Sequence, residues 1–274
     1  MKKVLLSILL LSVVLSMNAQ NSSVTLSQGG QESKANSTPK QLPPALQDLI
    51  ENMVYVEGGT FTMGDKSLLN EDQLGREKPE HQVTLSPFFI CRYEVTQDVW
   101  EAVMGNSFSP VKGAKLPVNN ICWDECQEFV VKLIFMTGIN FRLPTEAEWE
   151  FAARGGNKSL HTKYSGSNTI DDVAWYQYNS GNRLHPVGQK SPNELGLYDM
   201  TGNVSEWCYD YYGRYDSSAQ TNPKGASNSA ENVVRGGSIA QIPMGCHVTY
   251  RLGIIPAQRS TTLGFRLAAT PGSE

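Results

Sequence analysis

The amino-acid sequence predicts an α+β domain with few helices, short antiparallel strands and long ordered loops. Helical periodicity is confined to three segments, at residues 97–104, 123–136 and 146–154. After Gly156 that periodicity almost disappears, and the chain becomes dense in Gly, Asn, Ser, Trp and Tyr. A few helices followed by short strands and long loops indicate an α+β architecture. Loops of such length in a compact domain usually carry function or need additional contacts that keep them ordered.

Two strand-like runs occupy residues 53–63, MVYVEGGTFTM, on either side of Gly58 and Gly59. Short runs of this kind separated by two glycines predict a hairpin with a tight turn. A further strand is expected over residues 82–93, with a break at Pro87, because apolar and polar residues alternate there.

The first helix is predicted from the residues at its ends, and the second from the apolar residues on one of its faces. Thr96 precedes residues 97–104, and its hydroxyl is expected to accept an orphan backbone N–H of that helix, which Gly105 ends. The segment 123–136 carries apolar residues at the helical period, which predicts one buried face. These residues are Cys126, Phe129, Val130, Leu133 and Ile134.

Residues 141–156, FRLPTEAEWEFAARGG, predict the third helix. Thr145 and Glu148 have the spacing of a capping box, and the helix is expected to run to Arg154. The segment holds three acidic residues, Glu146, Glu148 and Glu150. Paired carboxylates are typical of glycosidases, but acidic residues at a helix start interact favourably with its dipole, and one already belongs to the capping box. We therefore expect a structural role for all three.

The charge balance argues against nucleic acid as a partner. The chain has 274 residues, with 23 Lys and Arg against 27 Asp and Glu, and a formal net charge of −4. Affinity for nucleic acid depends mainly on clustered basic side chains, which this chain lacks. No basic run marks a membrane-surface patch, and beyond the N-terminal segment no apolar stretch is long enough to span a bilayer.

The N-terminal segment has the pattern of a secretory signal peptide. Lys2 and Lys3 precede a short apolar run, so residues 1–20 are expected to direct export to the periplasm or the extracellular space. Residues 21–48 are rich in Ser, Gln, Asn and Pro and are expected to form a disordered leader, because they bury too little apolar surface to offset chain entropy. Residues 49–270 then form one domain.

Export makes the cysteine count relevant, because disulfides persist outside the cytoplasm. The five cysteines are Cys91, Cys122, Cys126, Cys208 and Cys246. An odd number leaves at least one thiol free or pairing between molecules, and the pairing stays open. Cys122 and Cys126 are neighbours on one helix face, where we expect two small core residues.

Five motifs occur in order along the chain: VEGGTFTMG at 56–64, FRLPTEAEWEFAARGG at 141–156, HPVGQKSPNELGLYDMTGNVSEW at 185–207, RGGS at 235–238 and LGFRLA at 263–268. In number and order they resemble the formylglycine-generating, or sulfatase-modifying, family over about residues 50–270. The resemblance implies that family's loop-rich α+β fold, which is similar to C-type lectins. Fold and function are separate inferences, since one fold hosts many functions.

The same resemblance bears on redox chemistry. Active members of the family oxidise a cysteine of a sulfatase motif to formylglycine, using oxygen and copper(I) held by two cysteines five residues apart. Counted from Ser238, those two positions hold Gln241 and Cys246. Copper(I) is soft and prefers thiolates, so the neutral amide of Gln241 is a poor ligand and copper is not expected as a cofactor.

By family position the candidate catalytic residues are Cys246 and Ser238, which matches the serine beside the family's catalytic site. Plainer roles stay open for both. A buried thiol, or one half of a disulfide, for example with Cys208, is the favoured interpretation of Cys246. Arg-Gly-Gly-Ser is also simply a turn sequence.

The GNVSEW stretch at residues 202–207 resembles a calcium site of the family. Asn203 and Glu206 would supply the hard oxygen ligands that calcium prefers, with backbone carbonyls completing the shell. An asparagine in a turn and a glutamate on the surface, with no metal between them, would give the same sequence pattern. The usual tryptophan between Val and Glu is Ser205 here, and a second calcium loop is expected somewhere in residues 172–182.

Three functions are compatible with these residues. The first is a formylglycine-generating oxidase, and Gln241 argues against it. The second is an exported protein- or glycan-binding or structural module that retains the scaffold, and export with an unstructured leader favours it. The third is a thiol-redox enzyme that uses Cys246 alone. The four histidines are isolated and predict no zinc site; they are His81, His161, His185 and His247.

Overall fold

The computed structural model describes residues 41–65 and 75–271. The predicted signal peptide and residues 21–40 of the predicted leader lie outside this part of the chain. The first element, α2 (Pro44–Glu51), crosses the domain boundary expected at residue 48. Its Leu46 and Leu49 are buried in the core, so the folded domain begins before the predicted boundary. A helix of one or two turns with only two core residues gives too weak a periodic signal to be found within a polar, Pro-rich segment.

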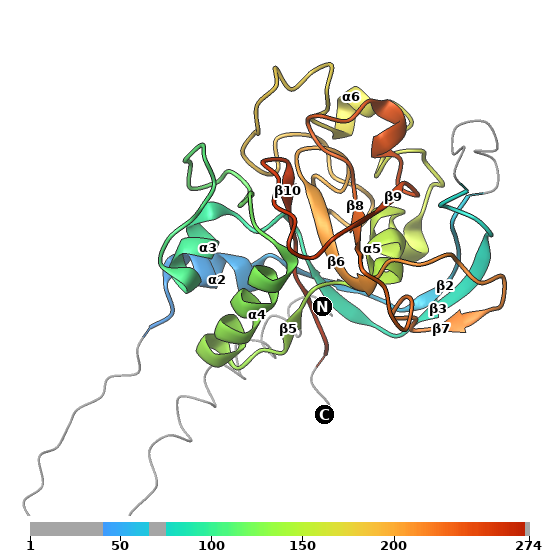
Figure 1. The fold of residues 1–274 in the computed structure, drawn as a ribbon, viewed down its shortest axis with the longest axis horizontal. Helices are drawn as coiled ribbons and strands as arrows, with labels where there is room; N and C mark the ends of the chain where they lie inside the picture. The colour runs from blue at the N-terminus through green and yellow to red at the C-terminus, as the bar shows by residue number, and fades with distance from the viewer. Residues whose placement is uncertain (1–40, 66–74, 272–274) are drawn as a thin grey trace, which may run out of the picture.

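Three helices pack on one side of the central strands, as Figure 1 shows. Besides α2 they are α3 (Gln97–Met104) and α4 (Trp123–Thr137). The predicted face of α4 is confirmed for four of its five residues, which are buried, whereas the fifth, Ile134, is half-buried and packs against the core. The four are Cys126, Phe129, Val130 and Leu133. Trp100 of α3 stacks on Phe129 with ring centroids 5.2 Å apart, which joins α3 to α4.

The ends of α3 agree with the prediction, but its cap does not. Gly105 adopts a left-handed conformation with φ 84° and ends the helix as expected. The Thr96 hydroxyl donates to the Asp98 carboxylate instead of accepting a backbone N–H. Asp98 accepts the N–H of Val99 at 2.9 Å, so the acidic residue caps the first turn.

The predicted hairpin at residues 53–63 is wrong. The two runs do form strands, β1 (Met53–Val56) and β2 (Gly59–Met63), but they belong to different sheets. The four-stranded sheet that contains β1 has the order β1, β4 (Phe88–Cys91), β11 (Ala268–Ala269), β5 (Phe141–Arg142). A three-stranded sheet has the order β2, β3 (His81–Leu85), β7 (Gln220–Thr221). Two adjacent glycines indicate a change of chain direction, but they do not determine with which strand each run pairs.

A third sheet lies at the centre of Figure 1 and carries the candidate site. Its order is β10 (Leu263–Gly264), β6 (Ser205–Tyr211), β8 (Asn232–Arg235), β9 (Arg251–Ile254). Strand β9 is an edge strand, and β10 pairs with β6 in parallel. The β3–β7 pair is also parallel, and the other strand pairs of the described structure are antiparallel, as predicted. Long connections allow these parallel pairs.

Helix α5 (Glu146–Ala153) packs against two of the sheets, and every one of its residues is buried. The predicted capping box is confirmed: the Thr145 hydroxyl accepts the Glu148 N–H at 3.2 Å, and Glu148 accepts the Thr145 N–H at 2.9 Å. Only short helices follow, namely η1 (Gly156–Lys158), α6 (Ile170–Val173) and η2 (Pro243–Cys246). In the part of the chain that is described, no helix is both long and apolar enough to cross a membrane.

Candidate functional site

The RGGS motif is a turn that leaves β8 and packs against η2. Gly236 and Gly237 have φ values of 90° and 70°, a region that L side chains rarely adopt. A Cβ atom on Gly237 would collide with the Gly245 carbonyl and lie 2.8 Å from the Cys246 sulfur. Glycine is therefore required at Gly237 for the turn to lie against the segment that carries Cys246.

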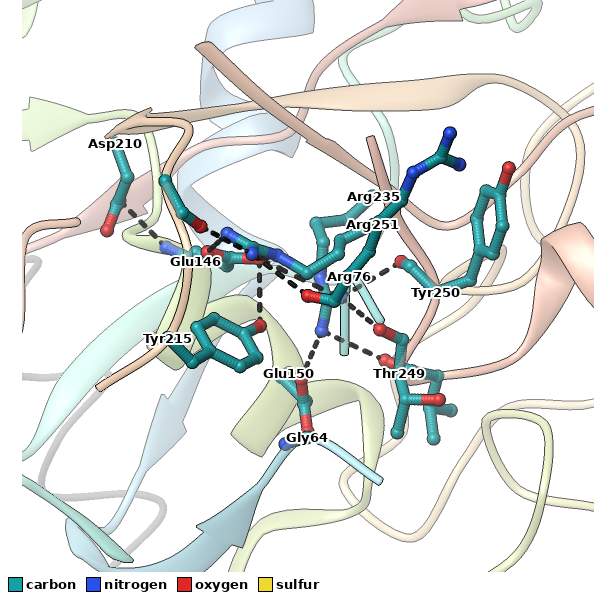
Figure 2. Close-up of polar contacts among 12 residues, drawn as sticks. Gly64, Arg76, Glu146, Glu150, Asp210, Tyr215, Arg235, Thr249, Tyr250 and Arg251 are labelled. Atoms are coloured by element: carbon teal, nitrogen blue, oxygen red, sulfur yellow. Dashed lines mark hydrogen bonds and ion pairs between the residues drawn. The ribbon is translucent and has the colours of Figure 1, made fainter. Parts of the chain in front are cut away.

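Arg235 anchors this turn in the core. Its guanidinium forms an ion pair with Glu150 of α5, and neither side chain is exposed. One terminal nitrogen also donates to the carbonyls of Thr249, at 2.6 Å, and Tyr250, at 2.9 Å (Figure 2). Although burial raises the pKa of Glu150, the neighbouring Arg154 and Arg235 hold it below its ordinary value.

A second buried pair lies beside the first in Figure 2. Arg251 of β9 donates from Nε to Glu146 Oε1 at 2.6 Å and from Nη2 to Oε2 at 2.7 Å. The Tyr215 hydroxyl donates to the same carboxylate at 3.1 Å, and the rings of Tyr212 and Tyr215 lie 4.5 and 4.1 Å from the guanidinium carbon. Such a bidentate pair fixes β9 against the start of α5.

These contacts explain the acidic residues of α5. Glu148, the third of them, pairs with Arg142 at 2.6 Å. Each of these carboxylates therefore forms an ion pair with an arginine, as the structural interpretation predicted. None of the three is free to act as the acid or base of a glycosidase. No local sequence pattern indicates which arginines are the partners.

The predicted calcium ligands occupy a third buried cluster. Glu206 of β6 accepts Arg266 at 2.6 and 2.7 Å and the Trp149 indole N–H at 2.7 Å, and it has no exposed surface. Asn203, with φ 55°, accepts the His185 N–H at 3.1 Å and donates to Glu94 at 2.7 Å. Calcium requires ligand oxygens that are free to approach it.

This donor set does not fit a cation. The Glu206 charge is already balanced by a guanidinium, and calcium beside Arg266 would meet a like charge. The calcium assignment therefore stays a prediction that the arrangement of these two residues opposes. Among the described residues, moreover, no three His, Cys, Asp or Glu side chains come together in a way that could hold a metal ion.

Sequence reasoning missed two acidic residues beside this cluster, Glu94 and Asp199. Both are buried, and burial, together with their mutual repulsion in the case of Glu94, raises their pKa values, that of Asp199 to about 6. One oxygen of Asp199 is buried with no hydrogen-bond partner in the described structure. Single acids inside YEVT and LYDM carry no periodic or spacing signal that could have revealed them.

Cys246 is fully buried at the end of η2. It packs in a small core cluster with Tyr164, Ile170, Val173, Ala174 and Tyr176. Burial raises the pKa of its thiol to about 12, even though the Ser238 backbone N–H favours the thiolate. A thiol with so high a pKa and no exposure is a poor nucleophile and a poor metal ligand at neutral pH. A catalytic role for Cys246 and Ser238 stays a prediction.

The described structure contains all five cysteines, and each is buried with a free thiol. The possible bond between Cys246 and Cys208 is not formed. Cys122 and Cys126 are buried on α4 and its N-cap, which agrees with the expected core role. No described thiol stands ready to complete a two-thiolate site with Cys246.

A surface groove of about 390 Å³ lies beside the RGGS turn. It runs between the turn, the start of β6, strand β9 and the loop that leads to β10. Its walls are formed by Ser205, Glu231, Ser238, Ala240, Gln241, Leu252, Gly253, Ile254, Ile255, Gln258, Ser260, Thr262 and Leu263. Thus Gln241 and Ser238 face the groove, whereas Cys246 is not part of its lining.

Comparison with protein-family models matches residues 38–271 to the Sulfatase-modifying factor enzyme 1-like domain. The formylglycine-generating enzyme of Streptomyces coelicolor is 31% identical over 299 residues, covering 82% of this chain and 91% of that protein. Chaperone protein LppX of Paenibacillus barcinonensis is 35% identical over 221 residues, covering 62% of this chain and 75% of that protein. Some Chlamydia proteins named serine/threonine-protein kinases also match, but the chain spans less than two fifths of their length.

The solved structure of Treponema denticola variable protein 1 superposes with a TM-score of 0.71 and 33% sequence identity. The match covers 80% of this chain and 95% of that chain. It confirms the loop-rich α+β fold predicted from the motifs, while the relation to C-type lectins stays a prediction. The relatives' names differ in kind, from an enzyme to a chaperone, over one shared scaffold.

Proposed function

Because the chain belongs to the sulfatase-modifying factor enzyme 1-like family but lacks a thiol at Gln241, we propose that it is an exported binding module rather than a copper-dependent oxidase. In this proposal the scaffold and the groove are kept for recognition of a protein or glycan, and the redox chemistry of the family is lost. Export rests on the N-terminal sequence pattern alone.

The observation that carries the proposal is the chemistry of Gln241 and Cys246, the two positions that correspond to the family's cysteines. Gln241 lines the groove and its amide oxygen lies beside Gly245, whereas the adjacent Cys246 is buried in a core of aliphatic and aromatic side chains. The two positions that would supply the thiolates for copper(I) therefore offer one neutral amide and one thiol whose pKa is raised to about 12. These residues do not fit the metal, so no oxidation step is assigned to them.

The rest of the site favours binding. The ion pairs of Arg235 with Glu150 and of Arg251 with Glu146 hold the turn and β9, which form two walls of the groove. Rigid walls reduce the entropy that a site loses when a ligand binds. Relatives that are named as a chaperone and as a formylglycine-generating enzyme support the idea that this scaffold serves more than one role.

The test is an oxidation assay with matched variants. The full chain, Cys246→Ser and Gln241→Cys are each incubated with copper(I), oxygen and a sulfatase-motif peptide, and the peptide mass is followed for conversion of cysteine to formylglycine. We expect no conversion by the native chain or by Cys246→Ser. Conversion by the native chain that disappears in Cys246→Ser would overturn the proposal. Conversion by Gln241→Cys alone would identify Gln241 as the residue that removes the activity.

A further inference from the structure

A second surface groove, of about 620 Å³, lies along β2, an edge strand of its sheet. We call it the β2 groove. Its walls come from β2, the start of β3, the C-terminal end of α5 and residues 156–161. It shares no lining residue with the groove beside the RGGS turn, so the two are separate features of the surface.

Uncharged hydrogen-bonding side chains make up much of the β2 groove. Thr60, Thr62 and Gln82 are exposed residues of β2 and β3, and Asn157 and Ser159 follow α5. Hydroxyl and amide groups of this kind can both donate and accept hydrogen bonds. An apolar ligand would leave them without partners and away from water, which opposes binding. The groove therefore suits a ligand that is itself rich in donors and acceptors.

The fold holds several of these groups in place before any ligand arrives. Gln82 Nε2 donates to the Thr62 hydroxyl at 2.7 Å, and Asn157 Nδ2 donates to the Gly58 carbonyl at 3.1 Å. A Cβ atom on Gly59 would collide with Asn157 Oδ1, so glycine at this position lets the amide lie against β2. Side chains that are fixed in advance lose less entropy when a ligand binds.

The ionisable side chains of the β2 groove disfavour a charged ligand. The Arg154 guanidinium forms an ion pair with Glu150 at 2.9 Å, so its charge is already compensated. Asp65 and Glu80 line the groove and would repel an anion. Each of these two acids already takes part in an interaction of its own, so neither is left over for a cation. The remaining ionisable group, His161, is exposed to water.

Phe61 adds an aromatic ring to this polar lining. It is half-buried in the β2 groove, and its ring centroid lies 5.2 Å from that of Phe151, which is buried behind it. A sugar combines hydroxyls, which pair with polar side chains, with C–H groups that pack on an aromatic face. An extended peptide would instead need apolar pockets for alternate side chains, which the polar walls do not provide.

From these observations we propose that the β2 groove binds a neutral oligosaccharide, whose hydroxyls pair with Thr62, Gln82 and Asn157. The volume of the groove lies within the range of small-molecule sites, about 300–1,000 Å³. Because this site lies apart from Gln241 and Cys246, the inference goes beyond the proposed function and does not depend on it.

The experiment applies the full chain to an array of neutral hexose and N-acetylhexosamine oligosaccharides and measures the retained ones by calorimetry. Two matched pairs test charge: chitotriose against its deacetylated, cationic form, and lactose against anionic sialyllactose. We expect at least one neutral sugar to bind with a Kd on the order of 1 mM or tighter, and charged counterparts to bind about tenfold more weakly.

Thr62→Val and Gln82→Leu should each weaken binding of the neutral sugar by about tenfold, because each removes hydrogen-bonding groups from the wall. The matched control is Thr84→Val. Thr84 is also an exposed strand threonine, hydrogen-bonded to the Thr60 hydroxyl at 2.8 Å, but it lies outside the lining of the β2 groove. Its variant should bind as the native chain does, and unchanged thermal midpoints establish that all three variants fold.

The inference is overturned if no neutral sugar is retained, if a charged counterpart binds more tightly, or if Thr84→Val weakens binding as much as Thr62→Val. Sugar binding that is lost in Gln241→Ala but kept in Thr62→Val would place the sugar beside the RGGS turn, which overturns this inference and keeps the proposed binding module. Formylglycine formation by the native chain, together with sugar binding that depends on Thr62, would overturn the proposed function and keep this inference.

Discussion

Arg235 of the RGGS motif and Glu150 of α5 form an ion pair in which neither side chain is exposed to solvent. The pair joins residues 85 positions apart and fixes the turn from which the groove is built. The motif arginine therefore acts through the core rather than at the surface. Removing Arg235 leaves the buried Glu150 with Arg154 as its remaining ion-pair partner, which is more costly than losing an exposed pair.

Replacement of Arg235 by Met should lower the free energy of unfolding by about 3 kcal/mol, because the buried Glu150 keeps only Arg154 as its ion-pair partner and the Thr249 and Tyr250 carbonyls lose a donor. Urea denaturation of the full chain measures this change. The control is Lys132→Met, which removes an exposed pair with Glu128 and should cost less than about 1 kcal/mol. Equal costs for the two variants would show that the buried pair contributes no more than a surface one.

The Cys246 thiol should resist alkylation in the folded protein. It is fully buried, and its pKa is raised to about 12, so almost no thiolate is present at pH 8. Iodoacetamide labelling followed by peptide mass spectrometry should modify Cys246 only after denaturation, and later than Cys122, which keeps 8% of its surface exposed. Rapid labelling of Cys246 in the native state would contradict the buried position of the thiol.

Stability should fall as the pH rises from about 4 to about 7. Burial raises the pKa of Asp199 to about 6 in the folded state, above its ordinary value near 4, so the folded state binds the proton more tightly than the unfolded chain. This contribution is complete below pH 4 and lost through pH 6. Asp199→Asn keeps an acceptor for the Gly188 N–H and should flatten the profile of thermal midpoint against pH.

The matched control is Asp216→Asn. Asp216 is exposed, and its hydrogen bonds with Ser218 lower its pKa, so any contribution it makes is lost only below pH 4. Its variant should reproduce the native profile between pH 4 and pH 7. A native profile that rises through this range, or an Asp199→Asn profile identical to the native one, would show that Asp199 is ionised without cost in the fold.

Calcium should not stabilise the protein through Asn203 and Glu206. The oxygens of both side chains accept hydrogen bonds from protein donors, and Arg266 balances the carboxylate. The weakest protein calcium sites have dissociation constants of about 1 mM. We therefore expect the thermal midpoint in about 5 mM calcium to equal that in excess EDTA. A calcium-dependent rise that is lost in Asn203→Ala would restore the calcium assignment.

Local signals predicted the helices well. The ends of α3 and α5 follow from Gly105 and from the Thr145 capping box, and the buried face of α4 follows from its period. Strand partners could not be predicted in the same way. Residues 53–63 contain two strands, but their pairing with β4 and β3 depends on contacts with later parts of the chain. Such contacts leave no trace in a short window of sequence.

In the candidate site, too, sequence position was predictable and three-dimensional surroundings were not. Gln241 and Cys246 were placed beside the RGGS turn by counting residues, and the structure does place the two in adjoining segments. The count could not show that one faces a groove and the other a core. The β2 groove was missed because its walls come from separate parts of the chain, and only the fold brings Asn157 against Gly59.

The central claim is that Gln241 and Cys246 do not form a copper(I) site, and competition with a chromogenic copper(I) chelator tests it most directly. The native chain should yield all of its copper to the chelator, as Cys246→Ser does, whereas Gln241→Cys regains a second thiol at the missing position. Retention of one copper ion per native chain, lost in Cys246→Ser, would contradict the account.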